Sequence, residues 1–341
     1  MPHVTQLDME SWYYKMVNLK ELITLIVPVR ERHYNLPCIV DYYKDTPYRK
    51  IIYDTSIEKY EGDLTGFEYF HKDPEYQHLS YLNSYSLVDT PFLLNCPDDD
   101  IMTHNSVYEC TKFMHENRDY SACDGLVVEW NPDDNTVLPE RKSEVFKSRV
   151  LHNWEADINL LQRLNFAIAE SSRSVLHSVL RTEDSVEIMQ NFIDNRHICP
   201  INFLDRVYTF AAACKGKFKT LPIVHHVRTS NRRANSDRVM DYSQVAAENI
   251  DGYGLEAGVS MANHLDDYYV SSYSHFLAKE TKMEDFMALQ YTKQLFSTHF
   301  RLRQQNGGGG YFGPNLPLSS VELPHKKESD IIEEALKSMR L

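Results

Sequence analysis

The sequence predicts an α/β protein with a mainly parallel sheet, flanked by helices and followed by a mostly helical C-terminal extension. Residues 22–29 form a continuous apolar run of the kind found in buried strands, and residues 36–43 carry apolar side chains at helical spacing. Lys50–Tyr53 is a second short strand that ends at Asp54. A strand, a helix and a strand in this order are typical of a βαβ unit, in which the strands are parallel.

The alternation of helices and strands continues to about residue 230. We expect helices at 76–87, 107–117 and 203–214, and strands at 91–96, 124–130 and 219–227. A helical pattern also covers 153–195, with Val175 and Val179 among its apolar residues. Asn131-Pro132 opens a turn after the strand at 124–130, and Gly216 stops the helix at 203–214. Residues 241–300 are predicted to be mainly helical and are rich in Tyr and Phe.

The pattern divides the chain into three parts: a sheet domain at 20–230, a helical C-terminal region at 231–303, and a glycine-rich hinge with an amphipathic tail at 304–341. The hinge contains Gly307–Gly310, which define no single backbone conformation. The tail ends in a short amphipathic helix, Ser329–Leu341, that could pack on the body or on a second copy of the chain. A homo-oligomer would be one consequence.

The composition sets further bounds. A chain of 341 residues, 42% of them apolar, can form a substantial core. The formal charge of −13 argues against sequence-independent nucleic-acid binding, which depends on Lys and Arg at phosphates. Six cysteines without CxxC spacing favour reduced, buried thiols. Because we find no apolar signal core and no transmembrane segment, we expect a cytoplasmic protein, or one held peripherally at the inner face of a membrane.

The run Asp98-Asp99-Asp100 follows directly on the apolar segment 91–96, as a loop follows a buried strand. Adjacent carboxylates repel one another unless a cation lies among them, and carboxylate oxygens are the ligands that Mg²⁺ and Mn²⁺ prefer. The run therefore indicates a site for Mn²⁺ or Mg²⁺. An acidic run can also cap the next helix or line a solvated loop, and the sequence leaves this alternative open.

Three polar segments are expected to meet at one edge of the sheet. Residues 28–32, 54–56 and 98–100 each follow a predicted strand. In open parallel sheets, ligands bind beyond the carboxyl ends of the strands. The sequence therefore predicts a ligand site built from these three segments.

The three segments, in this order, resemble the nucleotide-sugar glycosyltransferases of GT-A (Rossmann-like) fold, particularly the inverting, family-2-like bacterial group. Residues 23–32 resemble the opening strand and nucleotide loop of these enzymes, 51–56 the second strand with its base-contacting Asp, and 92–100 the strand that ends in the DxD metal motif. The resemblance covers residues 20–230 and implies a GT-A-like catalytic domain that binds a nucleotide sugar. Its specificity comes from the order and spacing of motifs that are common separately.

The resemblance also implies a set of metal ligands. Asp100 would contact the metal, and Asp98 would face the ribose or the metal through water. A histidine after the last strand would complete the shell, and since side chains alternate along a strand, only one of His225 and His226 should face the site. We take His226 as the candidate, although a histidine at a strand end can also be purely structural.

Donor binding is assigned to residues of the same three segments. Asp54 would accept a hydrogen bond from the base, Pro28, Arg30 and Arg32 would line the base and phosphates, and Asp99 would contact the donor sugar beside Asp98. The other interpretation is that Asp54 caps a turn and that the arginines face solvent.

Inversion requires a general base, which in the resembling family is an acid at the start of a helix before a Gly turn and a strand. Asp205 has this position, ahead of Gly216. The family usually carries an acidic pair here, but Leu204 precedes Asp205. Asp205 could instead be an acid favoured by the helix dipole, and Glu183 and Asp184 are weaker candidates for the base.

The implied function is metal-dependent transfer of a sugar, with inversion, from a UDP- or GDP-sugar to a glycan or glycolipid acceptor, in polysaccharide or glycoconjugate synthesis. A nucleotidyltransferase is one alternative, although residues 29–35 contain no glycine for a phosphate loop. A noncatalytic sugar-binding or scaffolding module of the same fold is the other. It would use aromatic side chains that could equally belong to a core, namely Tyr242, Tyr253, Tyr268, Tyr269, Tyr273 and Tyr291.

Overall fold

The structure is a computed structural model that describes residues 18–74, 77–130, 159–169, 175–194, 204–229 and 261–305. The strands are β1 (Ile23–Val29), β2 (Arg49–Asp54), β3 (Glu68–His71), β4 (Phe92–Asn95), β5 (Asp100–Met102), β6 (Tyr120–Trp130), β7 (Val179–Arg181) and β8 (Lys217–Thr229). The helices are α2 (Leu19–Leu22), α3 (Leu36–Tyr43), α4 (Gln77–Tyr85), α5 (His104–Glu116), α6 (Leu160–Ala169), α7 (Thr182–Asp194), α8 (Leu204–Lys215), α10 (Met261–Thr281) and α11 (Asp285–Gln305), with 3₁₀ turns η1 (His33–Asn35) and η4 (Val175–His177).

All eight strands form one sheet in the order β3-β2-β1-β4-β7-β6-β8-β5. The pairs β1–β2, β1–β4, β2–β3 and β6–β8 are parallel, while β4–β7, β6–β7 and β5–β8 are antiparallel. The predicted α/β class is confirmed, and the sheet is mixed, with four parallel and three antiparallel pairs. The parallel arrangement of β1, β2 and β4 brings their carboxyl ends to one edge, as the sequence predicted.

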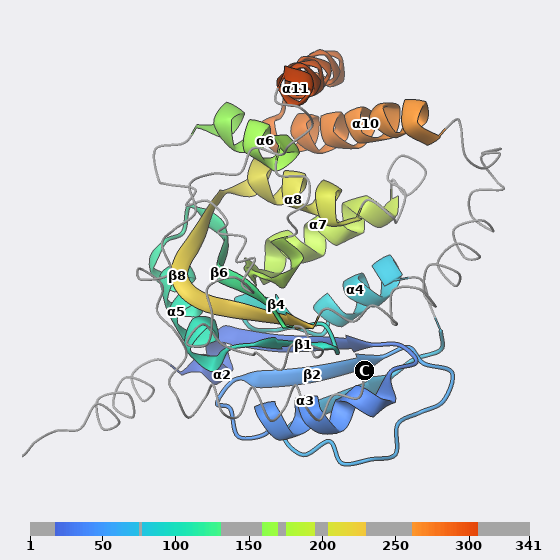
Figure 1. Cartoon of the computed structure of the whole chain (residues 1–341), viewed down its shortest axis with the longest axis vertical. Helices are drawn as coiled ribbons and strands as arrows, with labels where there is room; N and C mark the ends of the chain where they lie inside the picture. Colours follow the sequence, from blue (N-terminus) through green and yellow to red (C-terminus); the bar gives the residue numbers. More distant parts are fainter. Residues whose placement is uncertain are drawn as a thin grey trace, which may run out of the picture.

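Helices cover both faces of the sheet. Figure 1 shows α3 on one side of β1 and β2, and α7 and α8 stacked on the other side. Successive side chains of β1 enter two different cores: Leu25 and Val27 join the core with α3 and α5, and Ile26 joins the core with α4, α7 and α8. A strand buried on both faces requires an uninterrupted apolar run, which is the pattern at residues 22–29.

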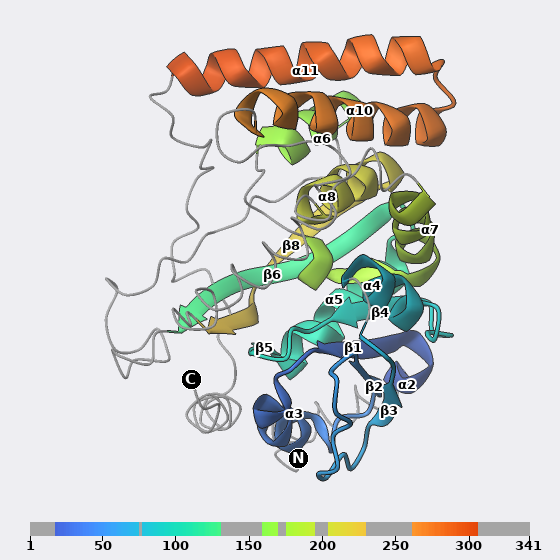
Figure 2. The same ribbon diagram turned by 90° about the vertical axis from the view of Figure 1, so that its right-hand side faces the viewer.

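The helical C-terminal extension is confirmed as far as the structure describes it. Helices α10 and α11 lie side by side as the outermost layer, beyond α6 and α8 (Figure 2). Predictions for 231–260 and for the glycine-rich hinge and tail beyond Gln305 lie outside the described residues, as does the turn at Asn131-Pro132. Self-association through the tail therefore stays a prediction.

The sequence misassigned one segment and missed two strands. Val175 lies in η4 and Val179 in β7, although the helical pattern at 153–195 included both. Strand β7 has only three residues and is buried on both faces, so its apolar run cannot be distinguished from a buried helix by periodicity. The short strands β3 and β5 were not predicted.

Two composition-based predictions can be compared with the structure. Cys38, Cys96, Cys110 and Cys123 are buried free thiols and Cys214 is a half-buried one, in agreement with reduced cysteines. Within the described ranges, no helix has the length and apolar content that crossing a membrane requires.

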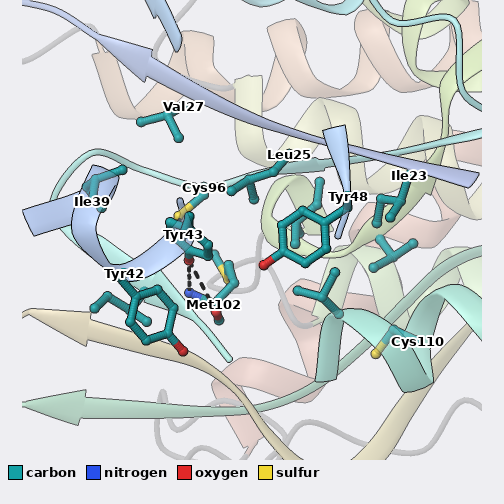
Figure 3. Packing of buried hydrophobic residues seen from close by; sticks show 14 of the residues in the cluster. Ile23, Leu25, Val27, Ile39, Tyr42, Tyr43, Tyr48, Cys96, Met102 and Cys110 are labelled. Carbon is teal, nitrogen blue, oxygen red and sulfur yellow. Dashed lines mark hydrogen bonds between the residues drawn. The ribbon is translucent and has the colours of Figure 1, made fainter. Parts of the chain in front are cut away.

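Tyr43 connects α3 to the strand that follows the acidic run. Its hydroxyl accepts a hydrogen bond from the Met102 backbone N–H at 2.7 Å and lies 3.1 Å from the Met102 carbonyl oxygen, to which it donates. Figure 3 shows both bonds inside the core between α3 and the sheet. Since Tyr43 is fully buried, no water can replace the hydroxyl, and the end of β5 is fixed to α3.

We expect Tyr43→Phe to lower the free energy of unfolding by about 1–3 kcal/mol, because it leaves the Met102 N–H and carbonyl buried without a partner. Urea unfolding of the full chain measures this. Tyr34→Phe is the control: the Tyr34 side chain is 51% exposed, and its loss should cost about 0.5 kcal/mol or less. Equal stability of both variants would show that the Tyr43 hydroxyl does not anchor β5.

Candidate functional site

The acidic run lies beyond the carboxyl end of β4 and is largely buried. Asp98 is 0% exposed and Asp100 is 6% exposed. Asp100 is the first residue of β5, and its backbone N–H donates to the Pro97 carbonyl at 3.2 Å. Helix α5 has Thr103 as its N-cap residue, so Asp98 and Asp100 neither cap this helix nor face solvent. This excludes the capping and solvated-loop alternative for these two residues.

Arg32 reaches the acidic run from the loop after β1. Its guanidinium lies 2.6 Å from Asp98 Oδ1 and also forms an ion pair with Asp99. Burial raises the pKa of Asp98 well above its usual range, and Arg32 acts in the opposite direction. Burial and the neighbouring Asp100 raise the pKa of Asp99, and Arg32 acts to lower it. Arg32 therefore stabilises carboxylates that would otherwise favour their protonated form.

Asp100 has a different partner. His226 Nε2 lies 2.7 Å from Asp100 Oδ2, which joins β8 to β5 beside the acidic run. His225 points the other way: its Nε2 donates to the His177 carbonyl, and its Nδ1 lies 2.9 Å from Ser106 Oγ. Burial lowers the pKa of His225 to about 4, so this ring is neutral at pH 7. Of the two histidines, the structure brings His226 to the carboxylates.

His177 is a residue that sequence reasoning missed. Its ring centroid lies 5.2 Å from that of His226, and its Nδ1 lies 3.2 Å from the Asn95 carbonyl at the end of β4. The signal was weak, since a single histidine in a 3₁₀ turn carries no motif. The buried Asn95 side chain is next to it in the fold, and neither its amide nitrogen nor its oxygen has a hydrogen-bond partner among the described residues.

Asp54 lies at the carboxyl end of β2, where it accepts several hydrogen bonds. Tyr69 Oη and His33 Nε2 lie 2.6 and 2.8 Å from its Oδ2, and the Ser56 N–H donates to its Oδ1 at 2.9 Å. Burial alone would raise the pKa of Asp54, but these bonds lower it below its ordinary value of 3.8. Asp54 is thus an ionised acceptor that the protein's own donors already occupy. The turn-cap interpretation holds for its Oδ1, and a base could reach Asp54 only by displacing a donor.

The loop between β1 and η1 is strained at one residue. Glu31 has φ of 56°, a left-handed conformation that is costly for a residue with a Cβ. Its N–H donates to Ser56 Oγ at 2.7 Å, and its Oε1 accepts from the Ile57 N–H at 2.7 Å. These bonds hold the loop so that Arg32 faces the acidic run and His33 faces Asp54. Backbone strain of this kind often occurs at functional loops.

The other predicted donor-binding residues lie on β1 and on the loop that follows it. Pro28 is half-buried in β1, opposite Tyr53 of β2, and Arg30 is exposed just beyond the end of the strand. Arg32 forms ion pairs with Asp98 and Asp99 of the acidic run.

Asp205 occupies the first turn of α8, while its side chain lies outside the described part of the chain. One turn further on, the Thr209 hydroxyl accepts a hydrogen bond from the Val175 N–H of η4. Since η4 also contacts the end of β4 through His177 and Asn95, the start of α8 lies on the side of the acidic run. The role of Asp205 as the general base stays a prediction.

Glu183 and Asp184 lie at the other end of the sheet. Strand β7 is antiparallel to β4, with Arg181 opposite Phe92, so α7 begins beside the amino end of β4. Burial raises the pKa of Asp184, and its charged neighbours include Lys215 and Glu280, far along the chain from the acidic run. These two acids therefore lie away from the acidic run, at the opposite end of β4.

The donor set fits Mn²⁺ or Mg²⁺ in part. Apart from the ion pair with Arg32, neither carboxylate oxygen of the buried Asp98 has a hydrogen-bond partner within the described ranges. Asp100 and His226, which bond to each other, could supply an oxygen and a nitrogen ligand. In the described part of the chain, no group of three or more His, Cys, Asp or Glu side chains is close enough to hold a metal alone. Mg²⁺ commonly uses one or two carboxylates and takes its remaining ligands from substrate phosphates and water, so a site completed by substrate remains compatible with these residues.

Of the six tyrosines considered for sugar binding, Tyr273 and Tyr291 are the two whose side chains the structure describes. Tyr273 is buried and stacks on Phe210 with ring centroids 4.1 Å apart, and Tyr291 packs at the edge of the same core. Tyr273 therefore belongs to the core and offers no platform for a sugar. The side chains of the other four tyrosines considered lie outside the described residues.

No protein-family model matches the sequence, and no curated protein matches it. The fold is similar to solved structures of S. aureus TarS. The fragment 1–349 matches with a TM-score of 0.42 and 12% identity, over 87% of this chain and 98% of that one. The complex of this fragment with UDP matches with a TM-score of 0.41 and 11% identity, over 88% of this chain and 100% of that one. Its complex with UDP-GlcNAc matches with a TM-score of 0.39 and 11% identity, over 87% of this chain and 98% of that one. Similarity at this level does not transfer an activity.

We expect Asp54→Asn to lower the free energy of unfolding by about 1–3 kcal/mol at pH 7, because it weakens hydrogen bonds to an ionised acceptor. Since the pKa of Asp54 is lowered in the folded protein, its contribution is present above the unfolded value near 3.8 and is lost as the pH falls below it. The difference between wild type and variant should therefore shrink below about pH 4. Urea unfolding at several pH values measures it, and a difference that is independent of pH would contradict the assignment.

Proposed function

We propose that the protein is a metal-dependent glycosyltransferase that moves a sugar from a nucleotide sugar, with UDP- and GDP-sugars as the leading donors, to a glycan or glycolipid acceptor with inversion. The observation that carries the proposal is the buried acidic run beyond β4, which is joined to the β1 loop by Arg32 and to β8 by His226. A cluster of this kind at the carboxyl ends of parallel strands suits a donor with a diphosphate. A cytoplasmic or peripheral membrane location belongs to the same proposal.

In this proposal, Asp98, Asp100 and His226 hold Mn²⁺ or Mg²⁺. The charge that develops on the diphosphate as the glycosidic bond breaks would be neutralised by this cation. Arg32 contacts Asp98 beside this position and would bind a phosphate oxygen through its planar guanidinium. Asp99 would contact the donor sugar.

The base of the donor would bind at the end of β2. Because Asp54 already accepts bonds from Tyr69, His33 and Ser56, its role is either to hold His33 and Tyr69 in place or to exchange one donor for the base. Arg30 and Pro28 lie on the adjoining strand and loop.

Asp205 would act as the general base. The acceptor hydroxyl oxygen attacks the anomeric carbon, the bond from this carbon to the diphosphate oxygen breaks, and the hydroxyl proton passes to the Asp205 carboxylate. Attack from the face opposite the leaving group inverts the anomeric configuration.

We expect a UDP- or GDP-sugar to raise the melting temperature of the full chain in the presence of Mn²⁺ and to lose most of this effect in EDTA, since a ligand that binds the folded state stabilises it. Asp100→Asn keeps the size of a buried side chain, but this variant should lose the Mn²⁺-dependent part of the rise in melting temperature. CMP-sugars, which lack a diphosphate, should have a weaker effect. Thermal shift measurements with the three donor classes test this.

The matched control is Asp119→Asn, which removes an acid paired with Lys217 at the amino end of β8. It should respond to Mn²⁺ and donor as the wild type does. If Asp100→Asn also responds fully, the acidic run does not hold the metal.

Asp205→Asn should keep donor affinity within about threefold and lose transfer by about 10²-fold or more, as expected when a general base is removed. Donor binding is measured by calorimetry and transfer by release of the nucleoside diphosphate in the presence of acceptor. Asp184→Asn is the control, because it also removes an acid from the first turn of a helix but at the other end of the sheet. Wild-type transfer by Asp205→Asn would exclude this residue as the base.

A further inference from the structure

Arg32 occupies the position next to the acidic run where a metal ion would be expected to act. Its guanidinium contacts Asp98 at 2.6 Å and pairs with Asp99, and the Arg32 side chain is only 16% exposed. The half-buried guanidinium thus joins the loop after β1 to the acidic run. Asp98 accepts no hydrogen bond from the rest of the described chain, so Arg32 is the cation that compensates its charge.

A guanidinium and a divalent cation cannot share these carboxylates without cost. Two cations a few ångströms apart repel each other, and in a partly buried site with an effective dielectric constant of about 20 the repulsion far exceeds its value in water. A divalent ion that binds Asp98 must therefore either push Arg32 away or bind more weakly because Arg32 is present.

We propose that Arg32 is a built-in counter-ion that competes with the divalent cation for Asp98 and Asp99, and that the donor's diphosphate relieves this competition by giving the guanidinium a new partner. The inference rests on the metal-binding part of the proposed function. The planar fork of Arg matches phosphate as well as carboxylate, so the same side chain can move from one to the other with little loss of hydrogen bonding. The metal and the nucleotide then bind cooperatively, each raising the affinity for the other by the same factor.

The test is Mn²⁺ binding to the full chain, by electron paramagnetic resonance or calorimetry, without nucleotide and with saturating UDP. Arg32→Gln should bind Mn²⁺ alone about tenfold or more tightly than the wild type, because a nearby positive charge is removed. UDP should raise the Mn²⁺ affinity of the wild type strongly and that of Arg32→Gln by a smaller factor. Arg32→Lys keeps the charge but not the fork, and its Mn²⁺ affinity without nucleotide should lie between the two.

The matched control is Arg49→Gln. Arg49 also bridges two carboxylates, Glu68 and Asp89, but it lies at the amino end of β2. It should leave Mn²⁺ binding unchanged within about twofold, since charges separated by more than a Debye length are screened. Circular dichroism of each variant checks that the fold is kept, and Arg32→Lys provides the readout if Arg32→Gln does not fold.

Two results would overturn the proposal in different ways. If Arg32→Gln binds Mn²⁺ with wild-type or lower affinity, Arg32 does not compete, and the proposed function is unaffected. If neither wild type nor variant binds Mn²⁺ with or without UDP, the metal-dependent part of the proposed function fails and the competition fails with it.

Discussion

The site depends on the compensation of adjacent carboxylates that the fold withdraws from water. Burying a charge is costly unless it is paired, and Asp98 and Asp100 are both buried beside Asp99. The compensating groups come from distant parts of the chain: Arg32 from the loop after β1 and His226 from β8. Each pair fixes the position of one segment relative to the acidic run, so the electrostatic requirement and the geometry of the site have the same cause.

Hydrogen bonds in the neighbouring segments hold this arrangement in place. Tyr43 fixes the end of β5 to α3 at Met102, two residues after Asp100, so the acidic run has little freedom to move away from its partners. On the other side, Asp54 organises the end of β2 through Tyr69, His33 and Ser56. The β1 loop lies between these two anchors, and Glu31 adopts its left-handed conformation where the loop turns. A polar site is thereby built on rigid strands with the loop held at both ends.

Much of the architecture followed from periodicity in the sequence. The apolar run at 22–29 and the helix at 36–43 match β1 and α3, because a strand buried on both faces and an amphipathic helix have clear patterns. Strands β5 and β7 were not predicted because three residues are too few to show a periodic pattern. Their positions are set by pairing with β8 and β4, respectively. Tertiary contacts, which a local pattern does not contain, decide such elements.

The candidate site, like the fold, could be predicted from the sequence only in part. The order of segments predicted that residues 28–32, 54–56 and 98–100 would share one edge, which parallel pairing of β1, β2 and β4 produces. The pattern could not show which partner each side chain takes. Arg32, expected at the donor, contacts Asp98 and Asp99 in the structure, and Asp54, expected at the base, accepts hydrogen bonds from the protein's own donors. Their roles toward a donor stay predictions. His33, Tyr69 and His177 carry no motif and became visible only through their contacts.

The most direct test is anomalous diffraction at the manganese edge from crystals of the full chain grown with Mn²⁺ and UDP. The account predicts an anomalous peak within coordination distance of the Asp98 and Asp100 carboxylates, with the UDP diphosphate against it and the Arg32 guanidinium on a phosphate oxygen. A nucleotide bound elsewhere, or a diphosphate bound beside these acids with no manganese peak, would contradict the central claim that the buried carboxylates hold a divalent cation against an activated sugar's diphosphate.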